Sequence, residues 1–469
     1  MGGSLAINQN LNRSMIRLAF IQFIRSGRYA GAGIRIGLFF LLAIGVISLF
    51  VGKQFAQQQQ QGITDVVQFQ QTDFPRQAAL HHDDMGLLLY YLKFSVINQT
   101  RPLTALAIGQ RDVNPSVQSV TIRGLEGQKY DADLTNPANL LLGNVDFSFV
   151  LVYLFPLLII AFTYSIISDE KENGTWSIVA VQSRHLLGFI GQLFLLRLAV
   201  VMAVMLLIVA LAIPVLGIPL DGVLGLFLGT SVGYILFWFS VCFWVASLQR
   251  ASSTNAILLL GIWLVLLIVL PAGVNNYITA RYPVPEAQAT TLAQRKGYHE
   301  KWDTDKTATL EKFYAHYPQF RQVPVVDMPT DWRWYYAMQQ LGDDESAGQA
   351  GELRQKLEQR ERASRSIAQF MPTLHTQLQL GELARSGLGN QLRFMDYTSQ
   401  FHEKMRLYSY PKIFTNAPVL AEKWTDFKVD TFTDEAPIHP LSVLGTFVLF
   451  IALFAGLGWF RFRQTIYHL

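Results

Sequence analysis

The sequence predicts an all-α polytopic membrane protein with six transmembrane helices and two long insertions outside the membrane. The first observation is composition: of 469 residues, 51% are hydrophobic and only 15% are charged, whereas soluble domains carry roughly 25% charged residues. The second is a series of apolar runs, several of which reach the ~20 residues that a helix needs to cross a bilayer. The third is the pair of polar stretches between these runs, residues 53–145 and 274–438.

The N-terminal segment, residues 1–35, is basic and contains no acidic residue. On a helical wheel its apolar face includes Phe20 and Phe23, and its opposite face includes Arg13, Arg17 and Arg25. This pattern predicts an amphipathic helix at the membrane interface. A cleaved signal peptide is the alternative, but no small-residue cleavage site follows the next apolar run. We therefore expect an uncleaved first span with its basic flank inside.

The apolar runs predict transmembrane helices at residues 36–52, 146–167, 189–216, 223–247, 256–273 and 441–460. Arg250, Arg461 and Arg463 lie on the same side of the membrane as the basic N-terminus, as the positive-inside rule requires. This topology makes both termini cytoplasmic, including the tail 461–469, and both insertions extracytoplasmic. Arg197 lies about two turns inside its span, where its side chain is expected to snorkel to the interface.

The two insertions predict two separate extracytoplasmic domains, since each is long enough to fold independently. The first, residues 53–145, is expected to be small and α/β-mixed, with the Gln57–Gln61 run in a helix leaving the membrane and a strand at Val120–Ile122. The second, residues 274–438, is expected to be mainly helical. Its helices are expected at Glu286–Tyr317, Glu352–Gln369 and Leu374–Tyr410, with a proline-broken connector at Pro318–Pro329.

A G-x-S-x-G pattern spans Gly229 to Gly233, but it lies in an apolar span rather than in the strand-turn-helix setting of a nucleophile elbow. Gly225, Gly229 and Gly233 recur every four residues and so form a small-residue stripe on one helix face. Such stripes favour close helix packing in membranes. We therefore interpret the pattern as packing rather than catalysis.

Metal, phosphate and nucleic-acid chemistry find no support in the sequence. Histidines of the insertions lack metal-ligand spacing: His81, His82, His299, His316, His375 and His402. The single cysteine, Cys242, lies in an apolar run and predicts a small buried side chain. No phosphate-binding loop occurs, and the basic residues form no patch for nucleic acid. No acidic residue, lysine or histidine lies mid-span, so energy for transport would have to come from another chain.

The segment 168–188, between the second and third spans, predicts a short charged hairpin at the cytoplasmic face. It opens with Ser168-Asp169-Glu170-Lys171-Glu172-Asn173-Gly174-Thr175. With the basic interfacial helix and six spans, this segment resembles the permease subunits of type 2 ABC transporters, the ABC-2 family. These permeases carry an acidic E-x-E-x-G-T motif, and Glu170, Glu172, Gly174 and Thr175 match it in this sequence. The order Asn136-Pro137, Gly143, Asp146 and Tyr153–Leu157 is similar to a branch with large external insertions, often grouped with permeases named for multicopper-enzyme maturation.

The resemblance implies a transport subunit of the bacterial inner (cytoplasmic) membrane that is not itself an enzyme and holds no cofactor. Two ATPase subunits would bind ATP and Mg²⁺, and a second permease, identical or different, would complete the complex within membrane lipid. The basic N-terminal helix would be the family's elbow helix. The hairpin would dock on the ATPase: Gly174 permits a turn, Thr175 caps the next helix, Glu170 and Glu172 meet basic residues, and Trp176 is a buried anchor.

Two alternatives remain open from the sequence. In the first, the complex moves no solute and instead transmits ATP-driven motion to a periplasmic partner protein. In the second, the chain is a membrane-anchored external enzyme, which the lack of a recognisable catalytic constellation disfavours.

Overall fold

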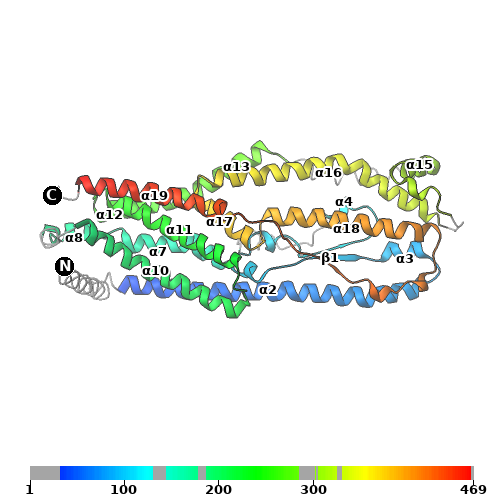
Figure 1. The fold of residues 1–469 in the computed structure, drawn as a ribbon, viewed down its shortest axis with the longest axis horizontal. Helices are drawn as coiled ribbons and strands as arrows, with labels where there is room; N and C mark the ends of the chain where they lie inside the picture. Colours follow the sequence, from blue (N-terminus) through cyan, green and yellow to red (C-terminus); the bar gives the residue numbers. More distant parts are fainter. Residues whose placement is uncertain are drawn as a thin grey trace, which may run out of the picture.

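The computed structural model describes residues 32–129, 144–177, 186–284, 302, 305–324 and 330–465. The molecule is elongated and mostly helical (Figure 1). Within the described ranges, six helices are long and apolar enough to cross a membrane. The prediction of a mostly helical chain with six apolar spans is therefore confirmed. The predicted interfacial helix with Arg13, Arg17, Phe20, Phe23 and Arg25 lies outside the described residues.

The spans form a bundle at one end of the molecule (Figure 1). Its elements are the N-terminal part of α2 (Ala32–Leu80), α6 (Phe147–Phe149), the π-helical turn η4 (Val150–Leu154), α7 (Phe155–Thr163), α8 (Ser168–Glu172), α10 (Leu186–Leu216), α11 (Gly222–Ala246), α12 (Ser252–Leu264), the π-helical turn η5 (Val265–Val269), α13 (Leu270–Arg281) and α19 (Pro440–Thr465). The span containing α7 is 67% buried and α11 is 61% buried, against 11% for α12–α13 and 17% for α19. The α7 span and α11 therefore form the centre of the bundle.

The other end of the molecule is a helical unit that contains a small sheet, called the external unit below because it lies outside the apolar spans. Its elements are the C-terminal part of α2, α3 (Met85–Tyr91), β1 (Phe94–Asn98), η2 (Pro102–Leu106), η3 (Gly109–Asp112), β2 (Val117–Val120), α4 (Glu126–Lys129), α15 (Lys306–His316), η6 (Pro318–Phe320), α16 (Trp332–Ala368), α17 (Pro372–Leu383), α18 (Leu388–Phe414), η7 (Val419–Ala421), η8 (Trp424–Asp426) and β3 (Asp430–Phe432). Side chains from both insertions share one core, including Phe94, Phe313, Tyr336 and Tyr410.

The sheet shows that the prediction of two separate external domains was wrong. Its strand order is β2-β1-β3, with β1 antiparallel to β2 and parallel to β3. Strands β1 and β2 belong to the first insertion, whereas β3 belongs to the second. The two insertions therefore fold as one unit. A three-residue strand such as β3 depends on its partner for stability. Its own sequence is too short to predict which strand it pairs with.

Helix α2 connects the two ends of the molecule. It continues for 49 residues to Leu80, well beyond the expected end of the first span, and runs along most of the molecule in Figure 1. The Gln57–Gln61 run lies within it, as predicted. At Gly52 the helix meets η2 so closely that a Cβ atom would lie 2.0 Å from the Ala105 carbonyl oxygen. The chain thus requires glycine where α2 passes the base of the external unit.

Several predicted boundaries differ from the structure. The strand expected at Val120–Ile122 is β2, which ends at Val120. Helix α16 begins at Trp332, well before the expected start at Glu352, because Trp334, Tyr335 and Tyr336 anchor its first turn in the external core. Of the helix expected up to Tyr317, the described part is mainly α15.

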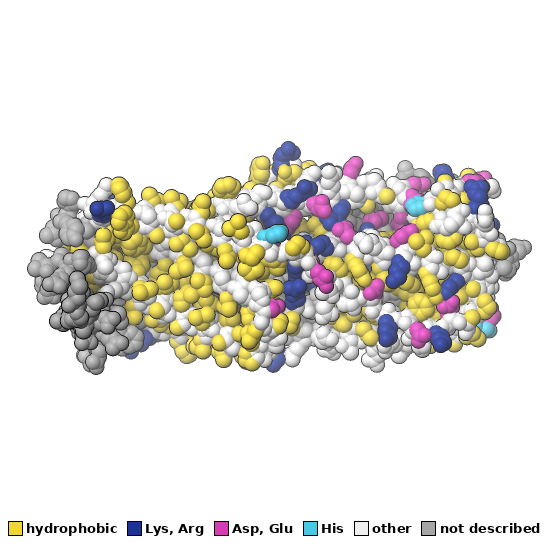
Figure 2. Space-filling model, in the orientation of Figure 1, with side chains coloured by type: hydrophobic (Ala, Val, Ile, Leu, Met, Phe, Trp, Pro, Cys, Tyr) yellow, Lys and Arg dark blue, Asp and Glu magenta, His cyan; other side chains and the backbone are white. Residues whose placement is uncertain are grey.

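The surface separates the two ends as a membrane protein requires. In Figure 2 hydrophobic side chains dominate the half formed by the spans, and Lys, Arg, Asp and Glu gather over the other half. Exposed apolar side chains of α12 include Ile257, which is 71% exposed. Patches of this extent are abnormal for a soluble surface and are normal where lipid is the solvent.

Candidate functional site

The candidate site is the end of the bundle where the central span α7 breaks and continues into the acidic hairpin. After Thr163 the chain makes a turn over residues 164–167 before α8 begins. The Ile166 N–H bonds the Thr163 carbonyl at 3.3 Å instead of the Phe162 carbonyl that an α-helix would select. Arg197 Nε donates to that Phe162 oxygen at 2.8 Å. The break in α7 is thereby fastened to α10.

Arg197 was expected to snorkel to the interface, which remains a prediction. The structure adds a specific partner for its guanidinium, the Phe162 carbonyl beside the break in α7. A second Arg197 hydrogen bond, from Nη1, goes to Leu193 O at 3.2 Å. Asn255 Nδ2 of α12 donates to Tyr164 O, also in the break, at 3.2 Å. Two spans therefore hold the turn that links α7 to the hairpin.

The hairpin is also bonded to the loop between α11 and α12. Glu172 accepts hydrogen bonds from the backbone N–H of Ser252 at 2.7 Å and from its hydroxyl at 3.1 Å. A carboxylate at this position stabilises the N-terminus of α12 through its open N–H groups and dipole. Ser252 Oγ also donates to Ser168 Oγ at 2.8 Å. Movement of α8 must therefore displace the start of α12.

A further chain of hydrogen bonds reaches the last span. Lys171 Nζ donates to Gln249 Oε1 at 2.7 Å, and Gln249 Nε2 donates to Thr465 Oγ1 at 3.0 Å. Gln249 has φ of 54°, a conformation that few non-glycine residues adopt. The hairpin is thus coupled to α10, α12 and α19 by named contacts.

The residues predicted to dock on an ATPase fall into different environments. Gly174 has φ of 74°, which suits a sharp turn at glycine. The Thr175 hydroxyl donates to Glu170 O at 3.1 Å and to the Glu170 carboxylate, so it closes the turn as a donor. The helix that Thr175 was expected to cap lies mainly outside the described residues. Asp169 is exposed and Glu170 is half-buried.

Trp176 is not available as an anchor for a partner in this structure. It is 4% exposed and belongs to the hydrophobic core of the bundle. Lys171 Nζ lies 5.6 Å from the centre of its ring. The hairpin folds back onto the spans, where burial of an indole in its own chain is favourable. Sequence reasoning identified a buried tryptophan but assigned it to the wrong surface.

The glycine stripe of α11 faces α19 over part of its length. A Cβ at Gly233 would lie 2.8 Å from the Phe447 ring, and one at Gly229 would lie 3.3 Å from Leu444. Gly225 has open space around it, so it takes no part in this contact. Ser231, the centre of the G-x-S-x-G pattern, is buried and donates to Phe227 O at 2.9 Å. The stripe packs within the chain.

Two π-helical turns interrupt spans at membrane depth, and sequence reasoning missed both. The first precedes Pro156, which has no N–H for the Val152 carbonyl. Tyr234 donates its hydroxyl to that carbonyl at 2.8 Å, and Trp263 donates to Tyr153 O at 3.2 Å. The second turn precedes Pro271, and Thr373 of α17 donates to Leu266 O at 2.8 Å. A proline within an apolar run was the available signal; π-turns are often functional.

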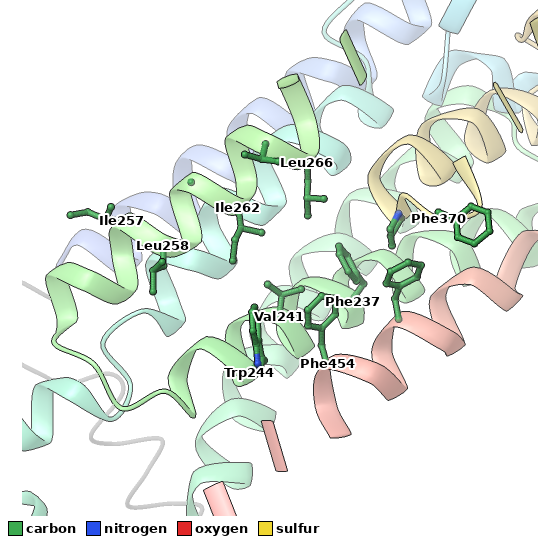
Figure 3. A pocket seen from close by; sticks show the side chains of 13 residues that line it. Phe237, Val241, Trp244, Ile257, Leu258, Ile262, Leu266, Phe370 and Phe454 are labelled. Atoms are coloured by element: carbon green, nitrogen blue, oxygen red, sulfur yellow. The ribbon is translucent and has the colours of Figure 1, made fainter. Parts of the chain in front are cut away.

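An apolar groove of about 540 Å³ opens beside the central span α11. Figure 3 shows Ile257, Leu258 and Ile262 of α12 and Leu266 of η5 on one side, facing Phe237, Val241, Trp244 and Phe454 of α11 and α19 on the other. Phe370, at the end of α16, closes one end. A groove of this volume and lining suits an apolar chain.

A buried ionic cluster lies where the external unit meets the bundle. Asp434 binds Arg393 at 2.7 Å, and Glu382 binds Arg385 at 2.9 Å and Arg393 at 3.2 Å. Arg111 of the first insertion bonds Asn98 Oδ1 at 3.0 Å. Burial alone would raise the pKa of Asp434, but hydrogen bonds from Arg393 and Asn390 hold it below its usual value. The charges come from three segments that are separated in the chain, around residues 111, 382–393 and 434, so no local sequence pattern predicts the cluster.

The histidines of the external unit serve structural contacts where the structure describes them. His375 Nε2 lies 2.9 Å from Val443 O, and His402 Nε2 lies 3.0 Å from Thr121 O. His316 Nδ1 lies 3.0 Å from Asp344. In the described ranges, no group of three or more His, Cys, Asp or Glu side chains is placed to hold a metal ion.

Fold and surface together define a multi-pass membrane protein. Comparison with protein families matches residues 288–433 to a domain of unknown function, DUF3526. The match covers α15 to α18 and β3, and leaves the spans and the hairpin outside it. No curated protein and no solved structure matches the chain.

Proposed function

We propose that the chain is the permease subunit of an ABC-2-type transporter, coupling ATP hydrolysis by a separate subunit to export or movement of a substrate across the bacterial inner membrane. The observation that carries the proposal is the bonding of the acidic hairpin. It extends the central span α7, and Arg197, Ser252 and Gln249 tie it to other spans. A push on the hairpin therefore acts on several spans at once, as ATP-driven coupling requires.

The open face of the hairpin supports docking on a basic partner. Asp169 is exposed, and Glu170 is half-buried with its carboxylate near the tip. Glu172 and Trp176, by contrast, are engaged within the chain. The proposed complex has two ATPase subunits that bind ATP and Mg²⁺, a second permease and surrounding lipid, with both termini cytoplasmic. Asp169 and Glu170 are its contact residues on this chain.

The groove beside α11 supports an apolar substrate. Its lining from Phe237 to Phe454 is almost entirely hydrocarbon, and the π-turn η5 forms part of its wall through Val265 and Leu266. A lipid-like molecule needs no charged group at membrane depth, which agrees with the composition of the spans. Ile262 faces Val241 across this groove in Figure 3.

Mechanical transmission to an external partner is a second candidate, favoured by α2. This helix passes without a break from the bundle to the external unit, and Gly52 seats it against the Ala105 carbonyl. Arg111 of the first insertion bonds the Arg385 carbonyl of the second, beside the ionic cluster of Glu382, Arg393 and Asp434. A rigid rod and a buried salt-bridge cluster transmit motion of the spans to the external unit even where no solute moves.

The first test is co-purification of the tagged chain from its native membrane in mild detergent, with mass spectrometry and an ATPase assay. We expect an ATP-hydrolysing subunit with the wild type and its loss in Asp169→Asn/Glu170→Gln, which removes charge but keeps an acceptor for Thr175. Glu435→Gln, an exposed acid of the external unit, is the matched control and retains the partner. Wild-type protein that brings down no ATPase contradicts the proposal.

The two candidates separate in proteoliposomes that contain the purified complex and ATP. Export predicts ATP-dependent transfer of a fluorescent lipid between leaflets, reduced when Ile262→Trp fills the groove. Mechanical transmission predicts no transfer, but an ATP-dependent change in distance between spin labels on the spans and on α16.

A further inference from the structure

A second cavity, of about 630 Å³, lies in the external unit between α2 and the sheet. Helix α2 contributes Gln58, Gln59 and Gly62 to one wall. Strand β2, from Val117 to Ser119, contributes the other wall. The cavity is half open to solvent and mainly polar, unlike the groove among the spans. Its volume is in the range of specific ligand sites.

Among the described residues, the β2 wall is a strand edge that no further strand pairs with. Strand β2 is the outer strand of the order β2-β1-β3. The Asn98 N–H bonds Ser116 O at 2.7 Å, and the register pairs Ile97 with Val117 and Ser95 with Ser119. Because hydrogen-bonded and non-hydrogen-bonded pairs alternate in antiparallel strands, the backbone groups of Val117 and Ser119 point away from β1. They offer a new strand a place to pair.

Two buried polar atoms beside this edge lack partners among the described residues. Arg111 is 2% exposed and lines the cavity. Its Nε bonds Arg385 O at 3.3 Å and its Nη2 bonds Asn98 Oδ1 at 3.0 Å, but its Nη1 has no hydrogen-bond partner. The side-chain oxygen of Gln59 is also unpaired. Buried polar groups are normally satisfied, so these two atoms mark unmet hydrogen-bonding capacity directly behind the cavity wall.

The charges around the cavity favour an acidic ligand. Lys93, Arg111 and Arg123 line it, against the single acid Asp112. Asp112 already accepts a hydrogen bond from Asn144 at 2.9 Å, and the three cations outnumber its single carboxylate. No aromatic side chain appears among the residues that line the cavity. Stacking, which commonly binds nucleobases, has no platform there.

We propose that this groove binds an extended acidic peptide segment of another protein on the same side of the membrane as the external unit. The segment adds a strand to the β2 edge and pairs with Val117 and Ser119. An acidic side chain or terminal carboxylate meets exposed Lys93 and is attracted by the Arg111 cation behind it. The site belongs to the external unit alone and does not require an ATPase partner.

The test uses the full-length chain in detergent and a fluorescent hexapeptide, Thr-Val-Thr-Val-Asp-Glu with a free carboxylate, measured by fluorescence anisotropy. Ser119→Pro removes an N–H that points away from β1, so it blocks the added strand while leaving the β1–β2 ladder intact. Ser119→Ala, which keeps that N–H, is its matched control. Lys93→Glu reverses a charge at an exposed residue and avoids disturbing buried Arg111.

We expect saturable binding that weakens at least tenfold in Ser119→Pro and Lys93→Glu and is unchanged in Ser119→Ala. The same peptide N-methylated at alternate backbone nitrogens should bind at least tenfold more weakly. Equal affinity for the methylated peptide, or full competition by free glutamate at equal concentration, shows a small-anion site and overturns the strand proposal. No binding at millimolar peptide also overturns it.

Discussion

Replacing Gly52 by alanine tests whether α2 is seated rigidly against the external unit. The added Cβ would lie 2.0 Å from the Ala105 carbonyl oxygen and 2.9 Å from its carbon. A carbon atom normally approaches a carbonyl oxygen no closer than about 3.3 Å, so α2 and η2 must separate by more than ~1 Å. The obstacle is backbone, which cannot rotate away as a side chain can. We therefore expect a penalty near the upper end for overpacking, about 3 kcal/mol.

Part of this loss is offset by the helix itself, because alanine in a helix interior is favoured over glycine by about 0.5–1 kcal/mol. Gly62→Ala supplies the control: it is the same substitution in the same helix, at an exposed position with nothing within 4 Å of the new Cβ. The two variants should differ by about 3 kcal/mol in unfolding free energy, because the helix gain is common to both and cancels, which leaves the overpacking penalty.

The assay is thermal unfolding of the full-length chain in one mild detergent, followed by tryptophan fluorescence at a fixed scan rate, since membrane proteins often unfold irreversibly. We expect Gly52→Ala to unfold at a clearly lower temperature than wild type and Gly62→Ala at the same or a higher temperature. Coincident unfolding of the two variants would refute the seating of α2 on η2.

Other predictions address the packing and pH response of the same chain. Gly233→Leu, which meets Phe447, should lower the unfolding temperature, whereas Gly225→Leu, in open space, should not; equal effects would contradict the contact with α19. Tyr234→Phe leaves the Val152 carbonyl without its donor, so we expect a loss of about 1–3 kcal/mol, and exposed Tyr277→Phe serves as its control in the same melts. Burial and the Arg406 cation hold the pKa of His402 well below its usual value. Below about pH 6.5 His402 is protonated in the unfolded chain but stays neutral in the folded one. The free energy of unfolding therefore falls as the pH is lowered, by up to about 1.4 kcal/mol per pH unit. His402→Gln should reduce the change in unfolding free energy between pH 6.5 and 5. An unchanged pH dependence would show that other groups cause it.

The spans were predictable because membrane burial depends on local composition. Each apolar run carries its own signal, and the observed helices begin and end within a few residues of most predicted limits, such as Gly222–Ala246 against 223–247. The turn at Gly174 was likewise local, since glycine followed an acidic run. Helix α2 continues beyond the predicted end of the first span at residue 52, because the glutamine run contains no residue that ends a helix.

Features made by distant residues could not be predicted in the same way. Strand β3 pairs with β1 across more than 300 residues of chain. The prediction that each insertion forms its own domain was therefore wrong. Trp176 was correctly recognised as a side chain to be buried, but burial is satisfied equally by the chain's own bundle or by a partner. Arg197 needed a carbonyl that becomes available only when α7 breaks at residues 164–167.

The breaks and the unbroken helix together limit how the molecule moves. The π-turns before Pro156 and Pro271 and the turn after Thr163 are places where the regular α-helical hydrogen-bond ladder gives way to bonds from other elements, through Tyr234, Thr373 and Arg197. Exchanging such bonds costs less than breaking a continuous helix, so displacement of the hairpin should concentrate there. Helix α2 has no π-turn or non-helical turn over its 49 residues, and its one internal proline, Pro75, lies in the last two turns, far from the spans. A movement that bends α7 and the α12–α13 span therefore tilts α2 as one body and carries the external unit with it.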